Sequence, residues 1–243
     1  MRSIDWDGVR ERVRALREER PWNAAWAELA APLAESQVAE AERQFGITFP
    51  ADYREFLLRV SAGGRWPREL RRGPDGWHWV GDADTQLERL HVPFPDHDAA
   101  LAASDEVWET FVREEDYTDP AEFAAARDVR SEAVEAAERD RVTGGVFLAG
   151  HGHCFSTLLI VSGPDRGSMW FDGRSTCERL NPLLTDAGRP AGFGEWYLDW
   201  LEHEEPLTTP ELEKAAGDRW HRGVGTPIWL RWFDDWEDNR RGR

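Results

Sequence analysis

The sequence predicts a fold that mixes helices with β-strands, because helical and strand patterns occupy different parts of its 243 residues. Apolar side chains recur at helical spacing within residues 36–60 and again within residues 193–201, which predicts an amphipathic helix in each stretch. Residues 146–172 contain short β-rich runs separated by a glycine-rich turn, which is typical of the centre of a sheet. We therefore expect helices that pack on a small sheet.

The N-terminal quarter of the chain is predicted to be helical. Residues 6–33 carry two apolar stripes separated by Pro21, which predicts two helices. Ser36 is expected to cap the next helix, and Gly46 is expected to end it. Pro50 suits the first position of the helix that follows.

Two short strands are predicted after these helices. Residues 77–80 alternate between apolar and polar side chains and are framed by turn sequences, which predicts a strand. Residues 90–93 predict a second short strand, and their proline favours an edge position.

Residues 96–142 form an acidic segment. They hold 15 acidic residues and five arginines, and so contribute −10 of the net charge of −17. Pro120 is expected to start a helix of strong helix formers, which Thr143 and the two glycines after it would end. We interpret the segment as a helical insertion; a solvated helix without a role is the alternative.

The composition bounds the class of partner and the compartment. An acidic chain repels phosphates and attracts basic proteins, so we expect no nucleic-acid ligand. No apolar run is long enough to span a membrane and the N-terminus lacks a secretion signal, so a cytoplasmic location is expected. With Lys214 as its single lysine, the composition is typical of a GC-rich genome, such as that of an actinobacterium.

Residues 36–66 resemble the opening of the SUKH superfamily, which includes yeast Smi/Knr cell-wall-synthesis regulators and bacterial toxin-immunity proteins. In that family an acidic helix is followed by a glycine, a short hydrophobic step, a proline and a helix with a Tyr-x-x-Phe-Leu core. The residues of this chain that carry the resemblance are Glu42, Gly46, Pro50, Tyr53, Phe56, Leu57, Gly63, Gly163 and Trp196.

The resemblance implies an α+β fold with a mixed, mostly antiparallel sheet flanked by helices. It implies a SUKH-like domain over residues 36–205, into which the acidic helical segment 96–142 is inserted. Residues 1–35 would then be a helical extension, and residues 206–243 a Trp-rich tail packed on the domain. We further expect the Tyr-x-x-Phe-Leu residues to belong to a hydrophobic platform that holds another polypeptide.

The resemblance also implies a binding function without catalysis or a cofactor. The leading expectation is an immunity protein, a monomer or weak dimer with no membrane partner, that occludes a basic polymorphic toxin such as a nuclease. A scaffold or regulator of the Smi/Knr type without a toxin is the alternative. The carboxylates expected to contact the partner are Glu109, Glu114, Glu115, Asp116 and Asp119.

One cluster, His151, His153 and Cys154, carries residue types used in metal binding and nucleophilic catalysis. A structural zinc site needs four ligands, however, and no second Cys/His pair stands at ligand spacing; Cys177 is the only other cysteine. The favoured interpretation is a glycine-rich turn that enters a strand, which leaves no metal ligand or catalytic residue predicted.

Overall fold

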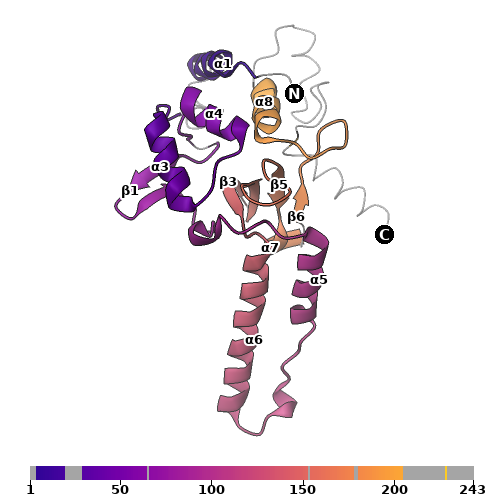
Figure 1. Cartoon of the computed structure of the whole chain (residues 1–243). Helices are drawn as coiled ribbons and strands as arrows, with labels where there is room; N and C mark the ends of the chain where they lie inside the picture. The colour runs from indigo at the N-terminus through magenta and orange to yellow at the C-terminus, as the bar shows by residue number, and fades with distance from the viewer. Residues whose placement is uncertain are drawn as a thin grey trace.

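The fold combines a compact body with a long helical hairpin that projects from one end of it (Figure 1). Helices and antiparallel strands both contribute to the body, so the α+β prediction is confirmed. The computed structural model describes residues 4–19, 29–64, 66–152, 154–177, 180–204 and 228.

The elements follow one another along the chain in three groups. The first comprises α1 (Trp6–Glu19), α3 (Glu35–Phe45), α4 (Ala51–Arg59) and the strands β1 (Leu70–Gly73) and β2 (Gly76–Trp79). The second comprises η2 (Leu87–Arg89), α5 (His97–Trp108), η3 (Glu114–Asp116) and α6 (Pro120–Asp140). The third comprises β3 (Gly145–Gly152), β4 (Phe155–Ile160), β5 (Met169–Asp172), α7 (Arg174–Cys177), β6 (Leu180–Pro182) and α8 (Phe193–Glu204).

The strands form two antiparallel sheets. A hairpin pairs β1 with β2, and a four-stranded sheet has the order β3-β4-β5-β6. In the larger sheet Leu158 of β4 is aligned with Phe147 of β3 and with Trp170 of β5. Side chains along these strands alternate between the two faces, and both faces are buried, as expected for residues 146–172.

The main core lies on one face of this sheet. Val146, Leu159 and Phe171 of β3, β4 and β5 belong to it together with apolar side chains of α1, α3, α4 and α8. Aromatic rings fill much of the space between the helices: Phe56 of α4 lies 4.8 Å from Tyr197 of α8, measured between ring centroids. The helix α1 therefore packs into the same core as the segment that carries the family resemblance.

The opposite face of the sheet carries a smaller cluster. Its members are Phe94, Val142, Phe147, Leu158, Ile160, Trp170 and Leu180. Phe94 and Val142 come from the two ends of the segment that leaves the body at α5 and returns after α6. This cluster therefore anchors the base of the projecting hairpin to the sheet.

The connection between α3 and α4 shows how the predicted helical pair is held. Gly46 adopts a φ of 68° at the C-terminus of α3, a left-handed conformation that favours glycine. The Glu42 carboxylate accepts hydrogen bonds from the backbone N–H of Phe49 at 2.9 Å and from Nε of Arg54 at 3.2 Å. One carboxylate thus ties the helix, the linker and the next helix together.

Three predicted details of secondary structure are wrong. Leu29 forms an isolated β-bridge with Gly64, and residues 30–34 are irregular, so the second predicted helix does not extend over residues 29–33. Residues 20–28 lie outside the described part of the chain.

The helix α3 begins at Glu35 and not after Ser36, because the Gln37 side chain accepts a hydrogen bond from Ala34 N–H at 2.8 Å.

Residues 90–93 form no strand. The N–H of Val92 donates to the carbonyl of Arg89 at 3.0 Å, which closes a turn directly after η2. The Leu90 side chain is buried and its carbonyl accepts a hydrogen bond from the Ser162 hydroxyl, so this segment packs as a turn against the sheet connection.

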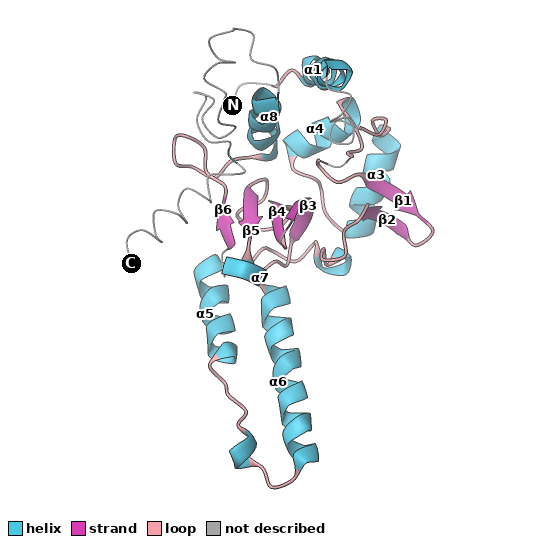
Figure 2. Cartoon of the chain, turned by 180° about the vertical axis from the view of Figure 1, so that it is seen from behind, coloured by secondary structure: helices cyan, strands magenta, loops and turns pink. Residues whose placement is uncertain are grey.

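The helical insertion is present as predicted, and α6 has nearly the expected limits. Figure 2 shows α5 and α6 running side by side away from the sheet, with η3 at the far end. Asp96 caps α5 by accepting from Ala99 N–H at 2.9 Å, and Asp119 caps α6 by accepting from Ala121 N–H at 2.8 Å. We call residues 97–140 the acidic hairpin.

Of the C-terminal tail, only Ile228 is described. Its side chain is buried in the main core, and its N–H donates to a carboxylate oxygen of Asp199 in α8 at 2.7 Å. The expected domain limits, including the tail over 206–243, stay a prediction.

Candidate functional site

The acidic hairpin is the most exposed part of the described structure. No side chain of α6 is buried, and Ser104 is the only buried side chain of α5. The expected partner contacts Glu109, Glu114, Glu115 and Asp116 are exposed, and the last three form η3 at the tip. These four carboxylates are therefore accessible to a second protein.

Asp119 differs from the other expected contacts. It is exposed, but its carboxylate caps α6 through the N–H of Ala121. Replacing it would disturb the first turn of the helix as well as the charge of the surface. Its role in folding must therefore be kept apart from any role in binding.

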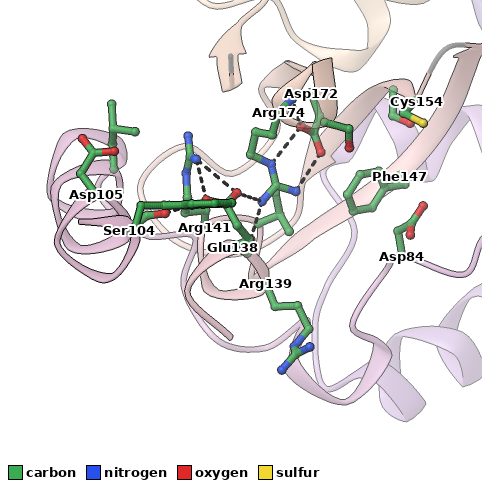
Figure 3. A pocket seen from close by; sticks show the side chains of 15 residues that line it. Asp84, Ser104, Asp105, Glu138, Arg139, Arg141, Phe147, Cys154, Asp172 and Arg174 are labelled. Atoms are coloured by element: carbon green, nitrogen blue, oxygen red, sulfur yellow. Dashed lines mark hydrogen bonds and ion pairs between the residues drawn. The ribbon is translucent and has the colours of Figure 1, made fainter. Parts of the chain in front are cut away.

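A cleft of about 1080 Å³ lies where the hairpin meets the sheet (Figure 3). Its lining combines side chains of α5, the last turn of α6, β3 and the start of α7, with Ser104, Asp105 and Trp108 contributed by α5. Asp84 and Cys154 line it from the connections that precede η2 and β4. Trp108, the last residue of α5, lines this cleft, so the cleft reaches the hairpin.

Four charged side chains of this cleft form an alternating network, drawn as dashed lines in Figure 3. Nη1 of Arg141 lies 3.1 Å from Oε1 of Glu138, and Nη1 of Arg174 lies 3.2 Å from Oε2 of the same carboxylate. Arg174 also pairs with Asp172 through Nη2 at 2.9 Å. The two arginines and two carboxylates balance in charge and join α6 and α7 to the end of β5.

Glu138 is the central member of this network. Burial raises the pKa of its carboxyl, but the hydrogen bond from Ser104 and the charges of Arg141 and Arg174 outweigh burial, and the pKa is lowered. Arg141 is only 4 % exposed, and its Nε and Nη2 have no hydrogen-bond partner among the described residues. The network therefore supports the base of the hairpin, and Glu138 is the carboxylate that both arginines share.

The structure places His151 in a partly buried position and Cys154 on the surface. Nε2 of His151 lies 2.7 Å from the Thr157 hydroxyl, and its ring packs edge-on against Trp66 with 4.7 Å between ring centroids. Cys154 is exposed in the turn between β3 and β4 with a φ of 64°. The glycine-rich turn next to a strand is therefore as predicted.

Burial, followed by the charge of Arg68, lowers the pKa of His151 to about 4, so the imidazole is neutral at neutral pH. His153 lies outside the described residues. Within the described part of the chain, no group of three or more His, Cys, Asp or Glu side chains could hold a metal ion.

The residues that carry the family resemblance lie in the fold's interior and at its turns. Tyr53, Phe56 and Leu57 are completely buried, as is Trp196 of α8. The expectation that the first three form a platform for another polypeptide therefore needs correction, since they contact no solvent. A Cβ at Gly63 would lie 2.5 Å from the carbonyl oxygen of Arg68, so this position requires glycine.

Comparison with known families covers the signature positions from Glu42 to Gly63, whereas Gly163 and Trp196 lie outside the match. The family model described as SMI1 / KNR4 family (SUKH-1) matches residues 32–126, a span that contains α3, α4 and the hairpin as far as α6. Over these residues the chain is similar to the SUKH superfamily, as the sequence predicts. Neither a curated protein nor a solved structure matches it.

This match agrees with the predicted resemblance, and the SUKH family is in general one of protein–protein interaction. The match ends within α6, so strands β3 to β6 and α8 lie beyond it. In the described residues no helix has the length and apolar character needed to cross a membrane.

The hairpin was found from sequence through its charge and composition, whereas the ionic network at its base was missed. Arg174 and Glu138 are 36 positions apart, and no local pattern pairs them. The only local signals are Arg174, two positions after the end of a strand, and Arg141, directly after a long acidic helix.

Proposed function

We propose that this SUKH-like protein is a non-enzymatic binding module of the immunity type, which neutralises a basic toxin domain by covering its functional surface. The acidic hairpin is the proposed contact surface. The observation that carries the proposal is the projection of this hairpin, with a net charge of −10 over residues 96–142, away from a body whose large apolar signature residues are buried.

Charge on a projecting element suits rapid capture of a basic partner. Complementary charge steers diffusional encounter and raises the association rate, whereas the lifetime of a complex depends on a few well-packed contacts. The carboxylates of Glu109, Glu114, Glu115 and Asp116 would pair with arginine or lysine side chains that the toxin otherwise uses on its substrate. The proposal includes a cytoplasmic location, where such a toxin would act.

The test uses the chain together with the product of the gene immediately upstream of its own. Co-expression should restore growth that the upstream product alone prevents. A hairpin variant with Glu109→Lys, Glu114→Lys, Glu115→Lys and Asp116→Lys should lose this protection, and its association rate should fall at least about tenfold at low salt. Asp119 stays unchanged because it caps α6.

The matched control reverses the same number of exposed carboxylates on the body, and the two variants carry the same net charge. It carries Asp75→Lys, Glu88→Lys, Asp165→Lys and Glu202→Lys, all at exposed positions outside the hairpin. Protection by the control and not by the hairpin variant supports the proposal. Equal loss in both variants contradicts a specific role for the hairpin, and an upstream gene without toxicity favours the Smi/Knr-type regulator.

A further inference from the structure

The acidic hairpin carries a group of exposed apolar side chains. Trp108 is 49 % exposed, Phe111 is 72 % exposed, and Val129 on α6 is 67 % exposed. In the described residues one further large apolar side chain, Leu184, is exposed, and it lies on the body. Single exposed apolar residues are ordinary, but a concentration of them on a highly charged element marks an interaction surface.

Arg130 of α6 orders this surface. Its guanidinium carbon lies 5.8 Å from the centroid of the Trp108 ring and 6.0 Å from the centroid of the Phe111 ring. Its Nη2 donates to the Trp108 carbonyl at 2.9 Å, and its Nε donates to the Thr110 carbonyl. One side chain therefore holds both the backbone and the rings of the segment, so the rings lose little freedom on binding.

We call Trp108, Phe111 and Arg130 the aromatic patch. Each ring has two faces, and a single guanidinium covers at most one face of each. The exposed fractions of Trp108 and Phe111 leave the remaining ring area open to a partner. Asp105 and Glu109 lie three and one positions from Trp108 along the chain, and both are exposed, so carboxylates are available close to this residue.

Charge decides which occupant fits the aromatic patch. A second copy of this chain would bring another hairpin of net charge −10 against the first, which opposes self-association through this face. A basic polypeptide meets no net repulsion, because the carboxylates of the hairpin outnumber Arg130 and its other arginines. Among basic side chains, arginine both stacks on an aromatic face and pairs in bidentate geometry with a carboxylate, whereas lysine offers a compact point charge.

We infer that the aromatic patch binds arginine side chains of an arginine-rich segment of the partner protein. Each guanidinium stacks on the open face of Trp108 or Phe111 and pairs with a neighbouring carboxylate. This inference rests on the proposed function for the location of the interface, but it adds a chemical preference that charge alone does not give. The stacked contacts are the short-range interactions that slow dissociation.

The test measures binding of the full chain to two fluorescent peptides of about ten residues, one of polyarginine and one of polylysine, by fluorescence anisotropy. At about 150 mM salt the wild type should bind polyarginine roughly tenfold more tightly than polylysine, since each stacked cation contributes several-fold to affinity. The variant Trp108→Ala/Phe111→Ala should bind the two peptides about equally.

Val129→Ala is the matched control, because it removes exposed apolar area from the same hairpin without removing a ring. It should keep the preference for polyarginine. Both variants alter exposed side chains, and far-UV circular dichroism with urea unfolding checks that their folding is unchanged.

The outcomes separate this inference from the proposed function. Equal binding of the two peptides by the wild type overturns the arginine preference but leaves the acidic interface intact. Loss of both peptides in the hairpin variant with four lysines supports that interface independently. Failure of the wild type to bind either peptide overturns both proposals.

Discussion

The indole nitrogen of Trp79 donates a 2.8 Å hydrogen bond to the hydroxyl of Tyr53 in the interior of the protein. Both side chains are almost completely buried, and the two residues are 26 positions apart. The bond joins the family's signature helix α4 to the small β1-β2 sheet. Burial raises the pKa of Tyr53, against the opposing effect of this hydrogen bond, so the phenol stays neutral.

Tyr53→Phe should therefore destabilise the protein, because it leaves the buried Trp79 N–H without an acceptor. We expect a loss of about 1–3 kcal/mol in the free energy of unfolding, measured by urea denaturation. Tyr197→Phe is the matched control, because the equally buried Tyr197 hydroxyl has no partner within the described part of the chain. It should be neutral or stabilising, and an equal loss in both variants would refute the assignment.

Glu138 should matter more than its partial exposure suggests. Its replacement by glutamine leaves buried Arg141 without a compensating charge, and breaking a buried pair on one side costs about 3 kcal/mol. Glu135→Gln is the control, since Glu135 pairs with Arg139 at an exposed site, where about 0–1 kcal/mol is expected. Urea unfolding of both variants measures the difference.

A second substitution tests the cause of that loss. In Glu138→Gln/Arg141→Met the uncompensated guanidinium is gone, so the double variant should regain stability relative to Glu138→Gln alone. If the double variant is less stable than the single one, the buried charge is not the source of the effect.

His151 should make stability depend on pH. Its pKa is lowered to about 4 in the folded protein by burial and Arg68, against an ordinary value of 6.5. Between these values the unfolded chain binds a proton that the folded protein does not. The free energy of unfolding should therefore fall as pH falls through this window, by at most about 1.4 kcal/mol per pH unit.

Urea unfolding of the wild type and His151→Gln between about pH 7 and pH 5 checks this expectation. Other titrating groups contribute to both proteins, so the difference between them isolates the histidine. The wild type should lose more stability than the variant on acidification. Parallel curves would show that His151 does not titrate differently in the folded protein.

The acidic hairpin should open more readily than the body. No side chain of α6 is buried, whereas the middle of β4 is completely buried. Local opening costs little where few apolar contacts are broken, so amides of residues 120–140 should exchange hydrogen faster than those of residues 155–160. Hydrogen exchange with mass spectrometry measures both, and equal protection would contradict the prediction.

The sequence predicts helix ends correctly where a residue type is suited to one particular position, as glycine is after a helix and proline is in its first turn. Gly46 ends α3 and Pro120 begins α6 as expected, because left-handed glycine and helix-starting proline have few alternatives. The strand predicted over residues 90–93 failed because tertiary contacts of Leu90 decide its conformation. The β-propensity of so short a run is weak by comparison.

The candidate site was likewise predicted only in part from the sequence. Net charge and helix propensity predict the acidic hairpin correctly. The apolar stripe of Tyr53, Phe56 and Leu57 was interpreted as a binding platform, whereas these side chains are buried in the core. An amphipathic stripe has the same spacing whether it faces the core or a partner. The aromatic patch was not predicted, because Arg130 meets Trp108 only through the antiparallel packing of the hairpin.

Because only one side chain of α5 and none of α6 is buried, the proposed contact surface is largely separate from the core that stabilises the fold. Under the proposed function, point changes along the hairpin would redirect binding to a different basic partner while the body tolerates them. The same independence makes the hairpin a natural place to graft an engineered epitope.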